Sequence, residues 1–202
     1  PLSYQPLARK YRPQVFADLV GQEATTIALQ NAFEMKRLPM TVIFSGVRGV
    51  GKTTVARIYA KALNCIDTSS PEPCNQCDSC KAIHLCNHED VVEIDGASNN
   101  GVDEIRALQE AVSYVPQRSL YKVYIIDEVH MLSTSAFNAL LKLLEEPPSH
   151  VVFIFATTEI HKIPQTILSR CQLFQLQKIL SQDICKRLKF ILNKEELSYE
   201  EK

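Results

Sequence analysis

The sequence lacks two features that would direct it to a membrane or to secretion. It has no run of about 18 apolar residues, the length that a membrane-spanning helix needs. Its opening stretch, PLSYQPLARKYRP, has no positively charged segment followed by an apolar one, so it does not resemble a secretory leader. We therefore expect a cytoplasmic protein with no membrane partner.

The chain also lacks an excess of charge of either sign. It has 22 Lys and Arg against 23 Asp and Glu, which gives a formal net charge of −1. Contact with a nucleic acid would therefore depend on a local patch or on assembly, not on the field of the whole protein. With 202 residues, 46% of them hydrophobic, the chain can bury one sizeable core and little more than one domain.

Four of the seven cysteines are clustered: Cys65, Cys74, Cys77 and Cys80. Two consecutive C-x-x-C steps can converge on one centre, and four thiolates suit tetrahedral Zn²⁺. A disulfide pair is disfavoured in a reducing compartment, and a redox C-x-x-C does not need four cysteines. We predict a structural zinc insert at residues 65–80. The remaining cysteines, Cys86, Cys171 and Cys185, are expected to be small buried residues.

Short apolar runs recur along the chain and predict the strands of a parallel sheet. Near-continuous apolar runs, as opposed to alternating ones, favour strands that are buried on both faces. Helical spacing of apolar residues lies between them, at Val55–Leu63 and at Phe137–Leu144, the latter ending before Pro147. Strands alternating with helices predict a doubly wound α/β domain. The five predicted strands are 41–46, 91–95, 122–127, 151–158 and 173–177.

The stretch GVRGVGKT fits the pattern G-x-x-x-x-G-K-[ST], follows a predicted strand and opens a predicted helix. In such a loop the backbone N–H groups surround phosphate oxygens. Lys52 would contact the terminal phosphates, and the Thr53 hydroxyl would bind Mg²⁺. A chance glycine loop is disfavoured because both flanking elements are present. The predicted ATP-contacting residues are Gly46, Val47, Arg48, Gly49, Val50, Gly51, Lys52, Thr53 and Thr54.

A second apolar run, KVYIIDEVH, ends on two carboxylates. Ligands of open α/β sheets bind at the carboxyl ends of the strands, so Asp127 is placed to hold Mg²⁺ and Glu128 to polarise an attacking water. The alternative is that the pair caps the following helix. His130 is expected to be structural, because Glu128 already fills the role of base.

Together these stretches resemble one family of AAA+ ATPases, the tau/gamma subunits of the bacterial DNA polymerase III clamp loader. The resemblance runs from about Ser3 to the end of the chain. The motifs that carry it are YQPLARKYRPQVFADLVGQE, GVRGVGKTT, the four-cysteine insert, IDGASNNGVDEIR, IIDEVHMLSTSAFNALLKLLEEPP, FATTE and ILSRCQ.

The resemblance implies further site residues and partners. Thr158, with Thr157 beside it, is similar to the first sensor of the γ-phosphate, and Arg170 of SRC to an arginine finger donated to a neighbouring subunit. Other clamp-loader subunits, a sliding clamp and primer-template DNA, held by its backbone, are the implied partners. The implied cover over adenine is Ala8, Tyr11, Arg12, Pro13 and Val20, and the implied DNA contacts are Asn99, Asn100 and Arg106.

The resemblance also implies the domain organisation and the activity. Residues 1–178 would form the AAA+ nucleotide-binding domain, and residues 179–202 the first part of a helical lid domain. The activity would be ATP hydrolysis that loads a clamp for DNA polymerase III, a nucleotidyltransferase. This 202-residue chain is expected to be weakly active, because the family's second-sensor arginine is expected beyond Lys202. It is expected to be monomeric, because the collar domain that assembles the family is not in this sequence.

Two alternatives belong to different functional classes. One is a non-hydrolysing structural subunit of the same complex, similar to the delta-prime subunit, against which the intact GKT and DE argue. The other is an AAA+ helicase motor, which is not expected to carry the zinc insert.

Overall fold

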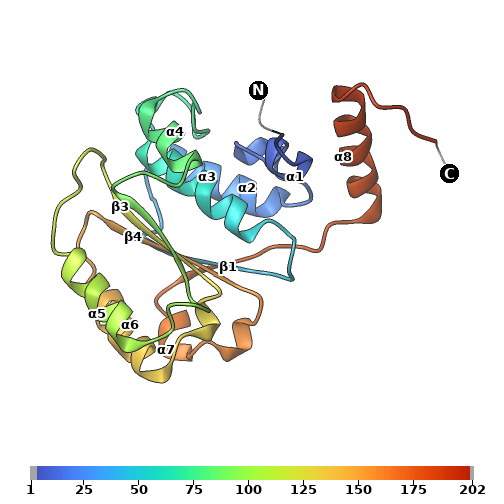
Figure 1. The fold of residues 1–202 in the computed structure, drawn as a ribbon. Helices are drawn as coiled ribbons and strands as arrows, with labels where there is room; N and C mark the ends of the chain where they lie inside the picture. The colour runs from blue at the N-terminus through green and yellow to red at the C-terminus, as the bar shows by residue number, and fades with distance from the viewer. Residues whose placement is uncertain (1–3, 201–202) are drawn as a thin grey trace.

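The computed structural model describes residues 4–200 and shows a parallel sheet with helices on both faces (Figure 1). Residues 1–3 of the first predicted domain and residues 201–202 of the second lie outside the described residues. The strand order is β2-β3-β4-β1-β5, and every pairing is parallel. This confirms the predicted five-stranded α/β fold. The strands are β1 (Thr41–Ser45), β2 (Val91–Asp95), β3 (Lys122–Asp127), β4 (Val151–Thr157) and β5 (Gln172–Gln175).

The helices form two layers, one on each face of the sheet (Figure 1). One layer holds α1 (Leu7–Lys10), α2 (Glu23–Glu34), α3 (Lys52–Asn64) and α4 (Asp78–His84). The other holds α5 (Val102–Ala111), α6 (Thr134–Glu145) and α7 (Gln165–Leu168). Short 3₁₀ turns complete the fold: η1 (Phe16–Asp18), η2 (Val129–Met131) and η3 (Ile160–Lys162).

The core consists of two apolar clusters separated by the sheet. Tyr59 of α3 and Leu29 of α2 pack on one face, while Ile105 of α5 and Leu140 of α6 pack on the other. The central strands β1, β3 and β4 are buried as predicted. The outer strands β2 and β5 are mostly exposed, so the prediction of burial on both faces is wrong for them, because each has a neighbour on one side only.

The predicted C-terminal helix is present as α8 (Ser181–Lys194), apart from the two main layers (Figure 1). It is attached to the N-terminal segment by polar contacts: Arg187 Nη2 donates to the Tyr11 carbonyl at 2.8 Å, and Glu195 bonds to Lys10 and Tyr11. Its apolar residues Ile184 and Leu188 are about half exposed. Within residues 4–200, no helix combines the length and apolar character needed to cross a bilayer.

Candidate nucleotide site and metal centre

The loop between β1 and α3 has the backbone that a phosphate-binding loop needs. Gly51 precedes the first turn of α3 with φ = 98°, in the left-handed region that glycine adopts without strain. Lys52 Nζ donates to the carbonyls of Gly46 and Val47, each at 2.9 Å. Burial lowers the pKa of Lys52, while the charges of Glu128 and Asp127 oppose that shift. The Lys52 side chain is thus held at the loop, within the electrostatic influence of Asp127 and Glu128.

Contacts between α3 and the end of β3 bring the predicted magnesium ligands together. Thr53 Oγ1 donates to Asp127 Oδ2 at 3.0 Å. A hydroxyl and a carboxylate are hard oxygen donors, which suit Mg²⁺. The residue that follows β2 contacts the same strand end, because Gly96 N donates to the Asp127 carbonyl at 2.8 Å. A Cβ at Gly96 would lie 2.7 Å from the Glu128 carbonyl, a close approach that sequence reasoning missed.

His130 connects Glu128 to the end of β4. Its side chain is only 4% exposed, and Nε2 lies 3.4 Å from Glu128 and 3.3 Å from Glu159. On the other side of the ring, Nδ1 shares a hydrogen bond with Thr157 Oγ1 at 2.9 Å. The expected structural character of His130 is consistent with this burial. Its link to Glu128 and Thr157 was not anticipated, although His130 lies only two residues after Glu128 in the DEVH stretch.

The two threonines at the end of β4 differ in their surroundings. Thr157 is fully buried, bonded to His130 and accepting the amide proton of Glu159 at 3.0 Å. Thr158 is half-buried and its hydroxyl makes no hydrogen bond to any of residues 4–200. Of the two, Thr158 therefore has the hydroxyl that is available to a ligand.

Arg170 follows α7 and is held by its own chain. Its guanidinium donates to the Thr166 carbonyl at 2.7 Å and pairs with Glu145 at 3.1 Å. The side chain is 34% exposed. Its contacts do not include the phosphate loop, so the structure does not bring Arg170 to the nucleotide site of the same chain.

A pocket of about 290 Å³ adjoins the loop and joins three segments that are distant in sequence. It contains every residue that the resemblance assigned to the cover over adenine, together with Gly49, Val50, Gly51 and Thr54 of the loop. Ile179 and, from α8, Arg187 and Ile191 line it too, which sequence reasoning missed. The assigned cover residues are Ala8, Tyr11, Arg12, Pro13 and Val20.

The four clustered cysteines converge as predicted. Their sulfur atoms all lie within 4.8 Å of one another, a span that one ion with Zn–S bonds of about 2.3 Å can bridge. None forms a disulfide. Backbone N–H groups of Gln76 and Cys77 point at the Cys74 sulfur and lower the pKa of that thiol to about 6, whereas burial raises the pKa of Cys65 and Cys80. The donor set fits Zn²⁺.

The cysteines outside this cluster do not follow the prediction of burial. Cys86 and Cys185 are exposed, and Cys171 is half-buried. Cys86 has a left-handed backbone with φ = 56° just after α4, and Cys185 lies on the sparsely packed α8. Neither position packs into the core.

The predicted DNA contacts lie around the start of α5. Asn100 and Arg106 have exposed side chains, while the half-buried Asn99 donates to the Asp95 carbonyl at 3.1 Å. Arg106 forms a loose pair with Asp103 at 3.3 Å. The side chain of Asn99 is thus partly occupied by its own loop.

Comparison with known proteins places the chain among subunits of one polymerase. Residues 21–180 match the family described as "DNA polymerase III, delta subunit". The chain is 56% identical to DNA polymerase III subunit tau of Bacillus subtilis and 51% identical to subunit tau of Escherichia coli, over 99% and 98% of its length. It spans only 36% and 31% of those relatives.

Solved structures are similar in fold. RuvB of Thermotoga maritima, titled a Holliday junction branch migration motor, gives a TM-score of 0.65 at 20% identity, covering 94% of this chain and 56% of that one. A DNA polymerase III gamma subunit-related protein of Thermotoga maritima gives a TM-score of 0.51 at 20% identity, covering 82% of this chain and 53% of that one. These likenesses support the α/β fold with its parallel sheet.

Proposed function

The chain belongs to the DNA polymerase III delta subunit family, with tau subunits among its relatives, and from this we propose that it is the ATP-binding part of a clamp-loader ATPase. The observation that carries the proposal is the contact of Thr53 with Asp127, which joins an intact phosphate loop to an intact acidic strand end. A subunit that does not hydrolyse ATP would not need both an intact phosphate loop and an intact acidic strand end. RuvB shares the fold, but it is only 20% identical to this chain, whereas subunit tau of Bacillus subtilis is 56% identical.

The residues divide the work of phosphoryl transfer. Thr53 and Asp127 would hold Mg²⁺, which neutralises phosphate charge. Lys52 supports the terminal phosphates, and Glu128 takes a proton from the attacking water. His130, hydrogen-bonded through Nδ1, restrains the Glu128 carboxylate relative to β4. Thr158 at the end of the same strand would then contact the γ-phosphate.

The expected result of Lys52→Ala is weaker binding of ATP. The variant loses a charge-assisted contact to phosphate, which corresponds to roughly a tenfold or larger rise in Kd. A fluorescent ATP analogue titrated with Mg²⁺ measures it. Lys142→Ala, which removes an exposed lysine on α6, is the matched control and should bind normally. Equal affinity of Lys52→Ala and the control would contradict the nucleotide site.

The cysteine cluster is proposed to hold one structural Zn²⁺. With four thiolates there is no open position for a reactive water, so the metal would fix the loop between α3 and α4. Lys61 supports this role from the side, because its buried Nζ donates to Asn75 Oδ1 at 2.7 Å within the insert.

Cys77→Ser is expected to lower the zinc content from about one ion per chain and to make the insert more sensitive to protease, while ATP binding stays near normal. Elemental analysis and limited proteolysis measure the two effects. Cys86→Ser is the control, because Cys86 lies outside the cluster. Absence of metal in the unaltered chain, or equal loss in both variants, would refute the zinc proposal.

The partners follow from the same proposal. Other clamp-loader subunits would receive Arg170 at their nucleotide, and a sliding clamp and primer-template DNA would be the objects acted upon. Asn99, Asn100 and Arg106 are proposed to contact DNA phosphates, since phosphate contacts position a protein on DNA without reading its sequence. Residues 179–200 are proposed to begin the lid domain, since α8 contributes to the nucleotide pocket.

A further inference from the structure

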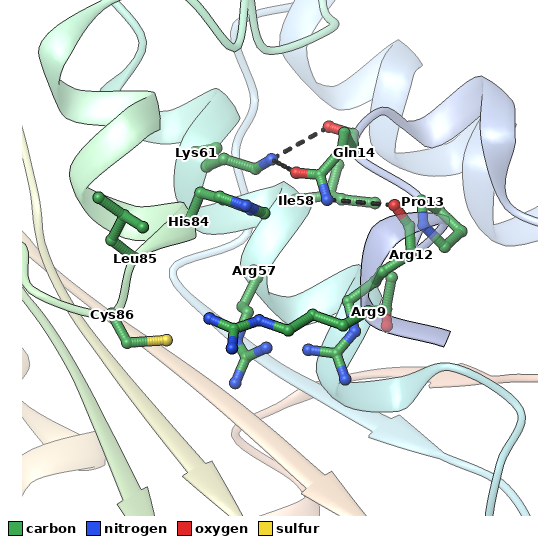
Figure 2. Close-up of a pocket in the computed structure, with 11 residues that line it drawn as sticks. Arg9, Arg12, Pro13, Gln14, Arg57, Ile58, Lys61, His84, Leu85 and Cys86 are labelled. Atoms are coloured by element: carbon green, nitrogen blue, oxygen red, sulfur yellow. Dashed lines mark hydrogen bonds between the residues drawn. The ribbon is translucent and has the colours of Figure 1, made fainter. Parts of the chain in front are cut away.

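A second pocket, of about 330 Å³, lies between α1, α3 and α4 (Figure 2). We call it the arginine pocket, after Arg9, Arg12 and Arg57, whose guanidinium groups gather at one side of it (Figure 2). Its volume falls within the range of about 300–1,000 Å³ that is usual for small-ligand sites. Arg12, Pro13 and Thr54 also line the nucleotide pocket, so the two pockets share a wall.

The cations of the arginine pocket have little compensating charge. No Asp or Glu lines it. Arg57 is paired with Glu93 of β2, its Nη2 lying 2.9 Å from Oε2, but the side chains of Arg9 and Arg12 have no hydrogen bond or ion pair with any of residues 4–200. Two neighbouring guanidinium groups therefore face an open concavity without an anion.

The lining of the pocket also includes a buried lysine, Lys61. Lys61 is 2% exposed, and its Nζ donates only to neutral oxygens, those of Gln14 and Asn75. Burial lowers the pKa of Lys61. Burial also lowers the pKa of His84, and four cations lower it further: Lys61, Arg9, Arg57 and Arg12. His84, which also lines the pocket, thus lies in the field of these four cations.

We propose that the arginine pocket binds a phosphate group other than the phosphates held by the loop at 46–53. Guanidinium forks match the geometry of phosphate oxygens and form charge-assisted hydrogen bonds with them. The phosphate group can come from a small phosphorylated molecule or from a DNA backbone. Bound there, it would contact α1 and α3, the same elements that line the nucleotide pocket, and would stabilise them against each other.

The test titrates pyrophosphate into the chain by calorimetry while ADP saturates the nucleotide site. Arg9→Ala is expected to weaken pyrophosphate binding by about tenfold or more, and Arg9→Lys by less, since lysine keeps the charge but loses the fork. Arg37→Ala, which removes an exposed arginine after α2, is the matched control and should change nothing. ADP affinity should be equal in all these proteins.

A parallel titration with a short DNA duplex separates the two sources. If Arg9→Ala weakens the binding of pyrophosphate, the ligand is a small phosphorylated molecule. If Arg9→Ala weakens the binding of DNA but not that of pyrophosphate, the ligand is a backbone phosphate. If neither probe responds to Arg9→Ala, the proposal is overturned. It is overturned too if Arg9→Ala weakens ADP binding as much as pyrophosphate binding, because the arginines would then belong to the nucleotide site.

Discussion

Glu128→Gln is expected to retain ATP binding and to lose about 10²–10⁴ of the rate of ATP hydrolysis, the usual contribution of a general base. The amide keeps the size and polarity of the carboxylate but cannot accept a proton from water. Lys52, Thr53 and Asp127, the groups proposed to bind phosphate and Mg²⁺, are unaltered, so the Kd of ATP should stay within a few-fold. Turnover is measured on the full-length subunit assembled with its partner subunits, clamp and primed DNA.

Glu159→Gln is the matched control for this experiment. Glu128 and Glu159 lie at similar distances from His130 Nε2, 3.4 and 3.3 Å, and are about equally exposed. Only Glu128 adjoins Asp127 at the end of β3, whereas Glu159 pairs with Lys162 at 3.0 Å. Normal turnover by Glu128→Gln, or a comparable loss in Glu159→Gln, would show that the base has been assigned to the wrong carboxylate.

The parts of the site that sequence predicted are those encoded by contiguous residues. Gly46–Thr53 specify their own geometry, because the glycines permit the left-handed turns and Lys52 begins the helix. Asp127 and Glu128 follow a buried strand, so the sheet rule places them at the ligand edge. The resemblance supplied Ala8 and Tyr11, whose place beside the loop no local pattern reveals.

The parts that sequence missed depend on packing between distant segments. Arg187 reaches the nucleotide pocket because α8 bonds to the backbone of Tyr11. The arginine pocket exists because α1, α3 and α4 meet around Lys61, whose partner Gln14 is 47 residues away. Helix α4 was also missed: it begins after Cys77, whose sulfur accepts the Cys80 amide, so the cysteine cluster also provides its N-cap.

Arg170→Ala is expected to cost about 10³-fold or more in ATP hydrolysis by the assembled complex, since an arginine supplied to phosphoryl transfer contributes on that scale. The side chain is one-third exposed and its contacts are to Glu145, Thr166 and Ser169 of its own chain. An arginine held away from its own loop but near the surface is placed to serve a neighbour. Affinity of the variant chain for ATP should remain normal, because its loop is intact.

Mixing two inactive variants tests whether that arginine acts between chains. In Arg170→Ala the loop is intact, and in Lys52→Ala the arginine is intact, so a mixed assembly regains interfaces that pair a good loop with a good arginine. Activity should rise above either pure assembly and peak at intermediate ratios. Glu145→Gln serves as the control, because it removes the partner of Arg170 but keeps the arginine, and it should retain turnover. If no ratio restores hydrolysis although assembly is verified, Arg170 does not complete a neighbour's site.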